Sequence, residues 1–140
     1  MAYDFERFIE AQRPIYAAVL EELRRGRKSS HWMWFVFPQV AGLGHSSRAR
    51  EFAITSLEEA RAYLAHPVLG ARLRECAEIT LGIDGRTASE IFGATDAMKL
   101  RSCMTLFHRA APEEPLFVQV LDRYFGGVAD ALTDECPRAP

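Results

Sequence analysis

Apolar side chains recur every three or four residues along most of this 140-residue chain, and that spacing limits the folds it can adopt. A period of this kind gives each helix one apolar stripe, whereas a half-buried strand needs a period of two. No stretch alternates cleanly enough to predict a strand. The sequence therefore predicts an all-α fold, a single compact domain with about seven to nine short helices around one core.

Residues that begin and end helices divide the chain into these segments. Pro115 is expected to start the last strong helix, and Gly26 and Gly126 are expected to end helices. We expect one helical domain over residues 1–132 and a frayed tail over residues 133–140. The helix N-caps that we expect are Asp4, Ser56, Thr87 and either Thr95 or Asp96, with Ser56 and Thr87 each in a capping box.

The bulk charge limits the partners of this protein. The formal net charge is -2 at pH 7 and the sequence pI is about 6.1. These values argue against bulk attraction to nucleic acid or to an anionic membrane. The N-terminus lacks the pattern of a signal peptide, and the longest apolar run is too short to span a bilayer. We therefore expect a cytoplasmic protein.

The cysteines and histidines carry no metal-binding pattern. Cys76, Cys103 and Cys136 are too far apart to form a C-x-x-C pair, and we expect reduced thiols, the first two of them in the core. The 4 histidines show neither H-x-x-x-H nor H-E-x-x-H spacing. We expect no bound metal and no cofactor.

The segment from Ser29 to Gln39 is dense in aromatic residues and follows a cluster of basic ones. Its spacing does not separate a strand from a short helix, and we favour a helix that starts at Ser30 and is ended by Pro38. Indole rings can stack on a planar ligand, and basic groups or free helix N–H groups can hold an anion. The alternative places the aromatics in the core and the basic residues at a solvated helix end. The ligand-binding residues that we expect here are Arg27, Lys28, Ser30, Trp32, Trp34 and Gln39.

Other charged residues could complete this site. Lys99 and Arg101 lie near an expected helix start, where the helix dipole does not favour cations. We expect them to bind the ligand anion as well, and the alternative is that they pair with Asp96 or Glu90, with Lys99 and Asp96 forming an exposed pair. His31 can move a proton near neutral pH. Glu10, or Glu6 on the same helix face, could act as a general acid or base if this helix packs against His31. The carboxylates for which a solvated surface position is the default are Glu6, Glu10, Glu21 and Glu22.

Residues 26–39, which read GRKSSHWMWFVFPQ, resemble the signature of a bacterial family that is named only as a domain of unknown function and is sometimes mislabelled calpastatin. The resemblance covers nearly the whole chain, from Phe5 to Asp130. It implies a mainly helical fold and a cytoplasmic location, and it brings no established reaction. The further matching pieces are residues 42–44, 59–64, 66–70, 91–93, 99–102, 104–107 and 124–127.

A more distant likeness is to the NADAR group, helical domains implicated in processing ADP-ribose or other N-glycosidic nucleotide derivatives. It rests on residues 104–107 and on the order of helices, and the catalytic glutamate of that group has no assignable position here. This likeness makes hydrolysis or processing of an N-glycosidic nucleotide the first functional hypothesis. The alternatives are a non-catalytic domain that binds a nucleotide or another small anionic metabolite, and a protein-interaction module that uses exposed aromatics. The sequence alone leaves open whether the protein is an enzyme.

Overall fold

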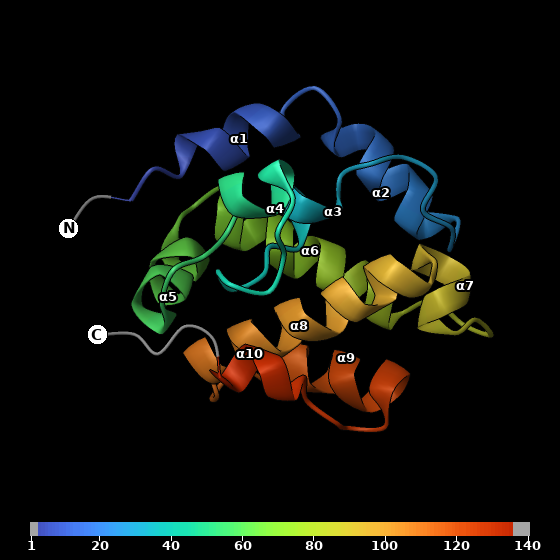
Figure 1. Cartoon of the computed structure of the whole chain (residues 1–140). Coiled ribbons are helices and arrows are strands. Elements are labelled where there is room, and N and C mark those ends of the chain that lie inside the picture. The colour runs from blue at the N-terminus through green and yellow to red at the C-terminus, as the bar shows by residue number, and fades with distance from the viewer. Residues whose placement is uncertain (1–2, 136–140) are drawn as a thin grey trace.

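The computed structural model describes residues 3–135, and this part of the chain contains ten helices (Figure 1). The same residues contain no strand, and β pairing is limited to one isolated parallel bridge between Val40 and Ile54. The all-α prediction is confirmed, with one helix more than the upper end of the expected range. The helices are α1 (Glu6–Gln12), α2 (Tyr16–Arg24), α3 (Met33–Val36), α4 (Ser47–Glu51), α5 (Leu57–Ala65), α6 (Leu69–Leu81), α7 (Ala88–Phe92), α8 (Ala94–Ala110), α9 (Pro115–Phe125) and α10 (Ala131–Glu135).

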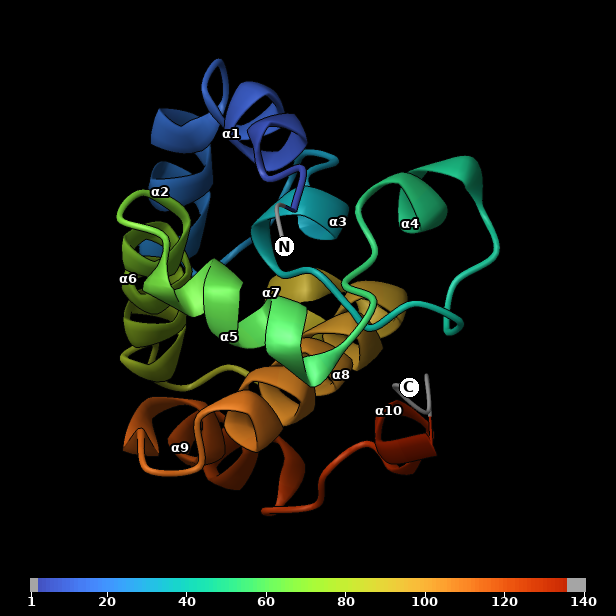
Figure 2. The ribbon, with the colours of Figure 1, turned by 90° about the vertical axis from the view of Figure 1, so that its left-hand side faces the viewer.

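Helix α8 is the central element of the fold. It has 17 residues and contacts α5, α7, α9 and α10. Figures 1 and 2 show it crossing the molecule, with α9 and α10 on one side and α5 on the other. Residues 102–107 of this helix are all buried. None of them is charged, and the hydroxyls of Ser102 and Thr105 donate to the carbonyl oxygens of Met98 and Arg101.

Aromatic side chains join the N-terminal helices to this central helix. Phe8 of α1 packs against Tyr63 of α5 with ring centroids 5.2 Å apart, and Tyr63 packs against Phe107 of α8 at 5.4 Å. All three side chains are fully buried. Pairs of this kind stabilise a fold beyond their buried area, so one continuous core runs from α1 to α8.

A buried amide fixes α3 beside α1. Gln12 is 2% exposed, and its Nε2 donates to the carbonyl oxygen of Phe35 at 2.6 Å. Its Oε1 accepts from Arg72 Nη1 of α6 at 3.2 Å. Because buried polar groups need partners of this kind, Gln12 sets the position of a helix that is only four residues long.

Several expected helix ends are confirmed. Thr87 and Glu90 form a complete capping box, in which the Glu90 amide lies 3.1 Å from Thr87 Oγ1 and the Thr87 amide lies 2.8 Å from Glu90 Oε1. Pro115 is the first residue of α9. Gly26 and Gly126 follow α2 and α9 with φ angles of 74° and 62°, which other residues rarely adopt.

Two expected helix starts are wrong. Phe5, rather than Asp4, is the N-cap of α1. Thr95 and Asp96 do not cap α8 but lie inside it, because the helix follows directly after Gly93. Gly93 has a φ of 84°, and this left-handed conformation turns the chain from α7 into α8 without an intervening loop.

The C-terminal part of the chain is helical further than we expected. Helix α10 continues through Glu135, so the helical region extends three residues beyond position 132. Thr133 is 5% exposed, and its amide donates to Asp130 Oδ2 at 2.9 Å. Residues 136–140 of the expected frayed tail, Cys136 among them, lie outside the described residues.

The core position expected for two cysteines is confirmed. Cys76 and Cys103 are fully buried free thiols. Burial raises the pKa of Cys76 to about 12 and raises the pKa of Cys103 well above its usual range, so neither is a reactive thiolate at neutral pH. No helix within residues 3–135 is long and apolar enough to cross a membrane. The same part of the chain contains no group of three or more His, Cys, Asp or Glu side chains arranged to hold a metal ion.

Candidate functional site

A buried carboxylate on α2 organises the aromatic segment. Glu22 is 4% exposed, and its Oε1 accepts hydrogen bonds from the Ser29 amide at 2.8 Å, the Ser30 amide at 3.1 Å and Trp32 Nε1 at 2.9 Å. Its Oε2 accepts a bond from the Ser30 hydroxyl. These bonds wrap residues 29–32 around the end of α2.

This arrangement corrects two expectations and confirms a third. Ser30 does not cap a helix, because its hydroxyl is bonded to Glu22. Glu22 is buried and not on the solvated surface. The sequence did not predict this, because the partners of Glu22 are backbone amides, a hydroxyl and an indole, and none of them is a charged residue. The segment forms a short helix, Met33–Val36, rather than a strand, and this helix ends before Pro38.

The same hydrogen bonds set the charge of Glu22. Burial raises the pKa of this carboxyl, but the bonds from Ser30, Ser29 and Trp32 together outweigh burial and lower its pKa from 4.5 to about 2. Glu22 is therefore ionised at neutral pH and acts as an acceptor of hydrogen bonds. A carboxylate of this kind organises a site and does not exchange protons near pH 7.

Two lysines meet at one carboxylate beside the aromatic segment. Lys28 Nζ lies 2.9 Å from Asp96 Oδ2, and Lys99 Nζ lies 3.4 Å from Asp96 Oδ1. Each ammonium also lies 4.9 Å from the centre of an indole ring, Lys28 over Trp32 and Lys99 over Trp34. Trp32 is a core residue with 1% exposure, whereas Trp34 is half-buried. The core alternative therefore holds for Trp32.

A third cation, which the sequence analysis missed, lies on the same indole. Arg48 of α4 is exposed, and its Cζ lies 5.6 Å from the ring centre of Trp34 and 5.9 Å from that of Phe35. No carboxylate within residues 3–135 is paired with Arg48. Arg48 follows the aromatic segment after a glycine-containing loop, and no local pattern indicated that it would return to these rings.

A hollow of about 290 Å³ lies beside this group, and we call it the α1–α4 hollow. Its wall is mostly apolar, and His31 and Arg48 supply groups that can bind an anion. No carboxylate of the described chain lines it. The lining residues are Ala11, Ile15, Ala18, Ser30, His31, Trp32, Phe35 and Arg48.

Other predicted site residues lie away from this hollow. Arg101 donates to the carbonyl oxygens of Val128 at 2.8 Å and Ala129 at 3.2 Å, so it fastens the C-terminal segment to α8. Arg27 and Glu10 are exposed, and neither lines the α1–α4 hollow.

Gln39 belongs to a second hollow, of about 440 Å³, which we call the Gln39 hollow. Arg7 of α1 lines it together with the glycine-containing loop and the end of α4. Gln39 therefore lies apart from the other predicted site residues. Six predicted residues do lie together, around the α1–α4 hollow and the Asp96 carboxylate: Lys28, Ser30, His31, Trp32, Trp34 and Lys99.

Comparisons with known proteins identify the family without a function. The sequence matches, over residues 2–136, the model of a family described as a protein of unknown function (DUF1810). The chain is also similar to the crystal structure of the conserved hypothetical protein Rv1873 from Mycobacterium tuberculosis, with 53% identity, 94% of each chain covered and a TM-score of 0.92. No curated protein matches it, and these matches give no support to the NADAR likeness. Since the family model spans nearly the whole chain, the protein belongs to the DUF1810 family.

Proposed function

We propose that this protein binds a small anionic molecule with a planar ring, such as a nucleoside monophosphate, in the α1–α4 hollow. One observation carries the proposal. Arg48 has no carboxylate partner within residues 3–135, and it lines a mostly apolar hollow beside aromatic rings. A guanidinium can bind a phosphate or carboxylate through two parallel hydrogen bonds, and aromatic walls suit a planar ligand.

The local charge also favours an anion. Lys28, Lys99 and Arg48 contribute three positive charges around Trp32 and Trp34, against the two negative charges of Asp96 and Glu22. These five groups therefore carry one net positive charge, although the whole chain has a net charge of -2. Arg48 makes the direct contact with the ligand, and Lys99 adds to the positive potential.

The volume of the hollow limits the ligand. Pockets that bind small molecules have volumes of about 300–1,000 Å³. The 290 Å³ of the α1–α4 hollow lies at the lower end of this range. A mononucleotide or a smaller aromatic acid suits this volume, whereas a dinucleotide such as NAD would extend beyond it.

The lining residues favour binding over cleavage. Hydrolysis of an N-glycosidic bond needs a carboxylate within hydrogen-bond reach of the substrate, directly or through one water. Glu22 is already bonded to the segment 29–32. Glu10, which we expected as a general acid or base, is exposed and outside the hollow. We therefore propose a binding domain rather than a hydrolase.

An interaction surface built from exposed aromatics has less support. The aromatic residues of the segment 31–39 are buried or half-buried. None of the large hydrophobic side chains that are exposed within residues 3–135 is aromatic. They are Leu57, Met98, Val128 and Leu132.

Calorimetric titration of the purified protein with AMP tests the proposal. We expect saturable binding of AMP and weaker binding of adenosine, which has the same ring and no phosphate. Arg48→Gln should bind AMP about tenfold more weakly, because a hydrogen bond to a charged group contributes roughly 1.5–3 kcal/mol.

The matched control is Arg50→Gln, which removes the same charge from the same helix at a position outside the α1–α4 hollow. It should keep the wild-type affinity for AMP. The proposal is wrong if the wild type binds neither AMP nor an aromatic carboxylate, or if Arg48→Gln binds as tightly as the wild type. Release of adenine during the titration would establish hydrolysis instead.

A further inference from the structure

Helix α4 carries Arg48, yet the helix itself is not anchored by packing. None of its five residues, Ser47–Glu51, is buried. Most helices in proteins are held by an apolar face that packs on the core, and an isolated helix of this length is not stable in water. The position of Arg48 therefore depends on the contacts of its own side chain with Trp34 and Phe35 and on contacts at the two ends of α4.

One contact at each end is evident. At the start of α4, Ser46 Oγ accepts the amide of Ala49 at 3.1 Å, a local bond that does not tie the helix to the rest of the protein. Directly after α4, Phe52 is 3% exposed and packs against Phe8 and Phe35 with ring centroids 5.5 and 5.3 Å away. Two residues further on, Ile54 exchanges backbone hydrogen bonds with Gln39 and Ala41 at 2.9 and 2.8 Å. Phe52 and Ile54 fix the chain after α4, and neither holds the last carbonyl of the helix, so the direction of α4 needs a further attachment.

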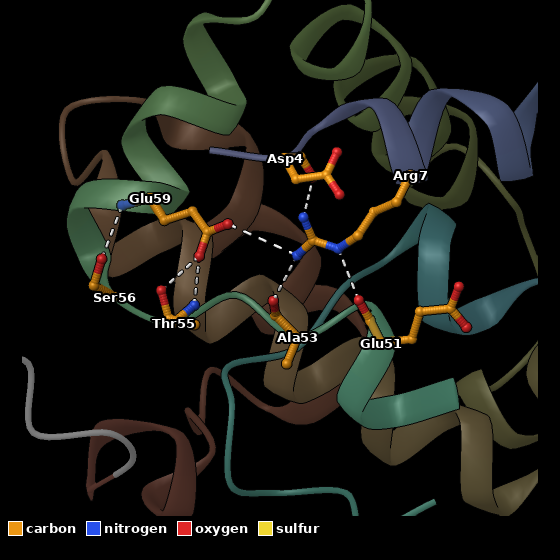
Figure 3. Close-up of polar contacts among 7 residues, drawn as sticks. All are labelled: Asp4, Arg7, Glu51, Ala53, Thr55, Ser56 and Glu59. Carbon is orange, nitrogen blue, oxygen red and sulfur yellow. Dashed lines mark hydrogen bonds and ion pairs between the residues drawn. The ribbon is translucent and has the colours of Figure 1, made fainter. Parts of the chain in front are cut away.

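Arg7 of α1 supplies this attachment at the end of the helix (Figure 3). Its Nε donates to the carbonyl oxygen of Glu51 at 2.7 Å, and its Nη2 donates to that of Ala53 at 3.1 Å. Its Nη1 donates to the carbonyl oxygen of Asp4. One planar guanidinium thus holds the backbone on both sides of Phe52 and ties it to the start of α1.

Glu59 of α5 holds the guanidinium from the other side, as Figure 3 shows. Glu59 is 3% exposed, and its Oε2 lies 3.8 Å from Arg7 Nη2. Its Oε1 accepts from both the amide and the hydroxyl of Thr55 at 2.7 Å. These bonds satisfy the Glu59 oxygen that does not face Arg7, as a buried carboxylate requires. We call Arg7, Glu59 and these bonds the Arg7 clamp.

We infer that the Arg7 clamp positions α4 for ligand binding, because it fixes the end of this helix and so holds Arg48 against Trp34 beside the α1–α4 hollow. Arg7 lines the Gln39 hollow and not the α1–α4 hollow, so its effect on the ligand passes through α4. The inference rests on the proposed function for the identity of the ligand. The contacts by which the Arg7 clamp holds the end of α4 are present without a ligand.

Arg7→Lys tests the positioning role, because lysine keeps the positive charge beside Glu59 but cannot donate to both carbonyls in the geometry of a guanidinium. In hydrogen exchange without ligand, the amides of residues 47–54 should exchange about tenfold faster, with exchange in α6 and α8 unchanged. Acrylamide should also quench tryptophan fluorescence more strongly, and this change reports on Trp34 because Trp32 is 1% exposed. Glu59→Gln should have the same effects.

The control is Arg13→Lys, which makes the same exchange at a surface position directly after α1, where the side chain is 65% exposed. It should change neither exchange nor quenching. With AMP, Arg7→Lys should lose about as much affinity as Arg48→Gln, and the double variant should lose little more.

Unchanged exchange over residues 47–54 in Arg7→Lys overturns the inference. So does faster exchange in these residues with an unchanged affinity for AMP. If the wild type binds no anion, the proposed function fails, and the exchange and quenching experiments still decide whether the clamp holds α4.

Discussion

The ionised side chain of Glu22 is buried, with 4% exposure, and the donors that bind it belong to residues 29–32. Where water is excluded, removal of an acceptor destabilises the protein by more than the net free energy of the hydrogen bond, because the donors that remain are buried without a partner. The residues that surround the α1–α4 hollow therefore depend on a carboxylate that does not line it.

Replacing Glu22 by Gln should lower the free energy of unfolding by about 2–4 kcal/mol, since an amide keeps the shape but removes the charge that the donors bind. Urea denaturation followed by circular dichroism measures this difference. Glu21→Gln is the control, because the Glu21 side chain is 72% exposed, and it should change stability by less than about 0.5 kcal/mol. Equal stabilities of Glu22→Gln and the wild type would contradict this role.

Glu22 also gives stability a pH dependence with a definite sign. Its pKa is about 2 in the folded protein, below the ordinary 4.5, so folding favours the ionised form. The resulting stability is complete above pH 4.5 and is lost as the pH falls from 4.5 toward 2. The stability difference between the wild type and Glu22→Gln should be constant near neutral pH and shrink in that acidic range. Urea denaturation at several pH values checks this, and a constant difference throughout would rule it out.

At the scale of helices, the boundaries that the sequence predicted are those set by adjacent residues. The capping box of Thr87 and Glu90 and the start of α9 at Pro115 depend on neighbours in the chain, and both are confirmed. Helix α4 could not be predicted from periodicity, because it has no apolar face. The expected capping box at Ser56 forms only in part, since the Glu59 carboxylate bonds to Thr55 and to the Arg7 clamp.

Gly93→Ala should destabilise the protein by about 1–3 kcal/mol, because its φ of 84° and ψ of 157° are open almost only to glycine. Crowding does not explain the effect, since a Cβ there would meet no atom within 4 Å. Gly82→Ala is the matched control, with a φ of -84° that alanine adopts freely. Its stability should be unchanged or up to about 1 kcal/mol higher. Thermal and urea unfolding compare the two, and equal effects would refute the backbone explanation.

At the scale of the whole molecule, the sequence predicted the segment that carries the candidate site but not its full set of neighbours. Residues 26–39 are distinctive because their aromatic and basic side chains are adjacent in the chain. Arg48 and the Arg7 clamp reach this region only through the packing of α1, α4 and α5. Such contacts depend on tertiary structure, and no local spacing encodes them.

The continuous core makes a prediction for unfolding. Since aromatic contacts join α1, α5 and α8, we expect all helices to unfold in one cooperative transition. Far-UV circular dichroism reports on every helix, whereas fluorescence reports on Trp32 and Trp34 in the N-terminal half. Urea transitions followed by the two signals should have the same midpoint. Separate midpoints would mean that α1–α4 unfold as an independent unit.

The most direct test of the proposed function is an NMR titration of the isotopically labelled protein with AMP, because it locates the ligand. We expect the largest shifts at the amides of residues 30–35, at Ala11 and at Arg48, with the Gln39 hollow unaffected. Shifts centred on residues 42–44 and 53–55 would place the ligand in the Gln39 hollow instead. Either that result or the absence of any shift would contradict binding in the α1–α4 hollow.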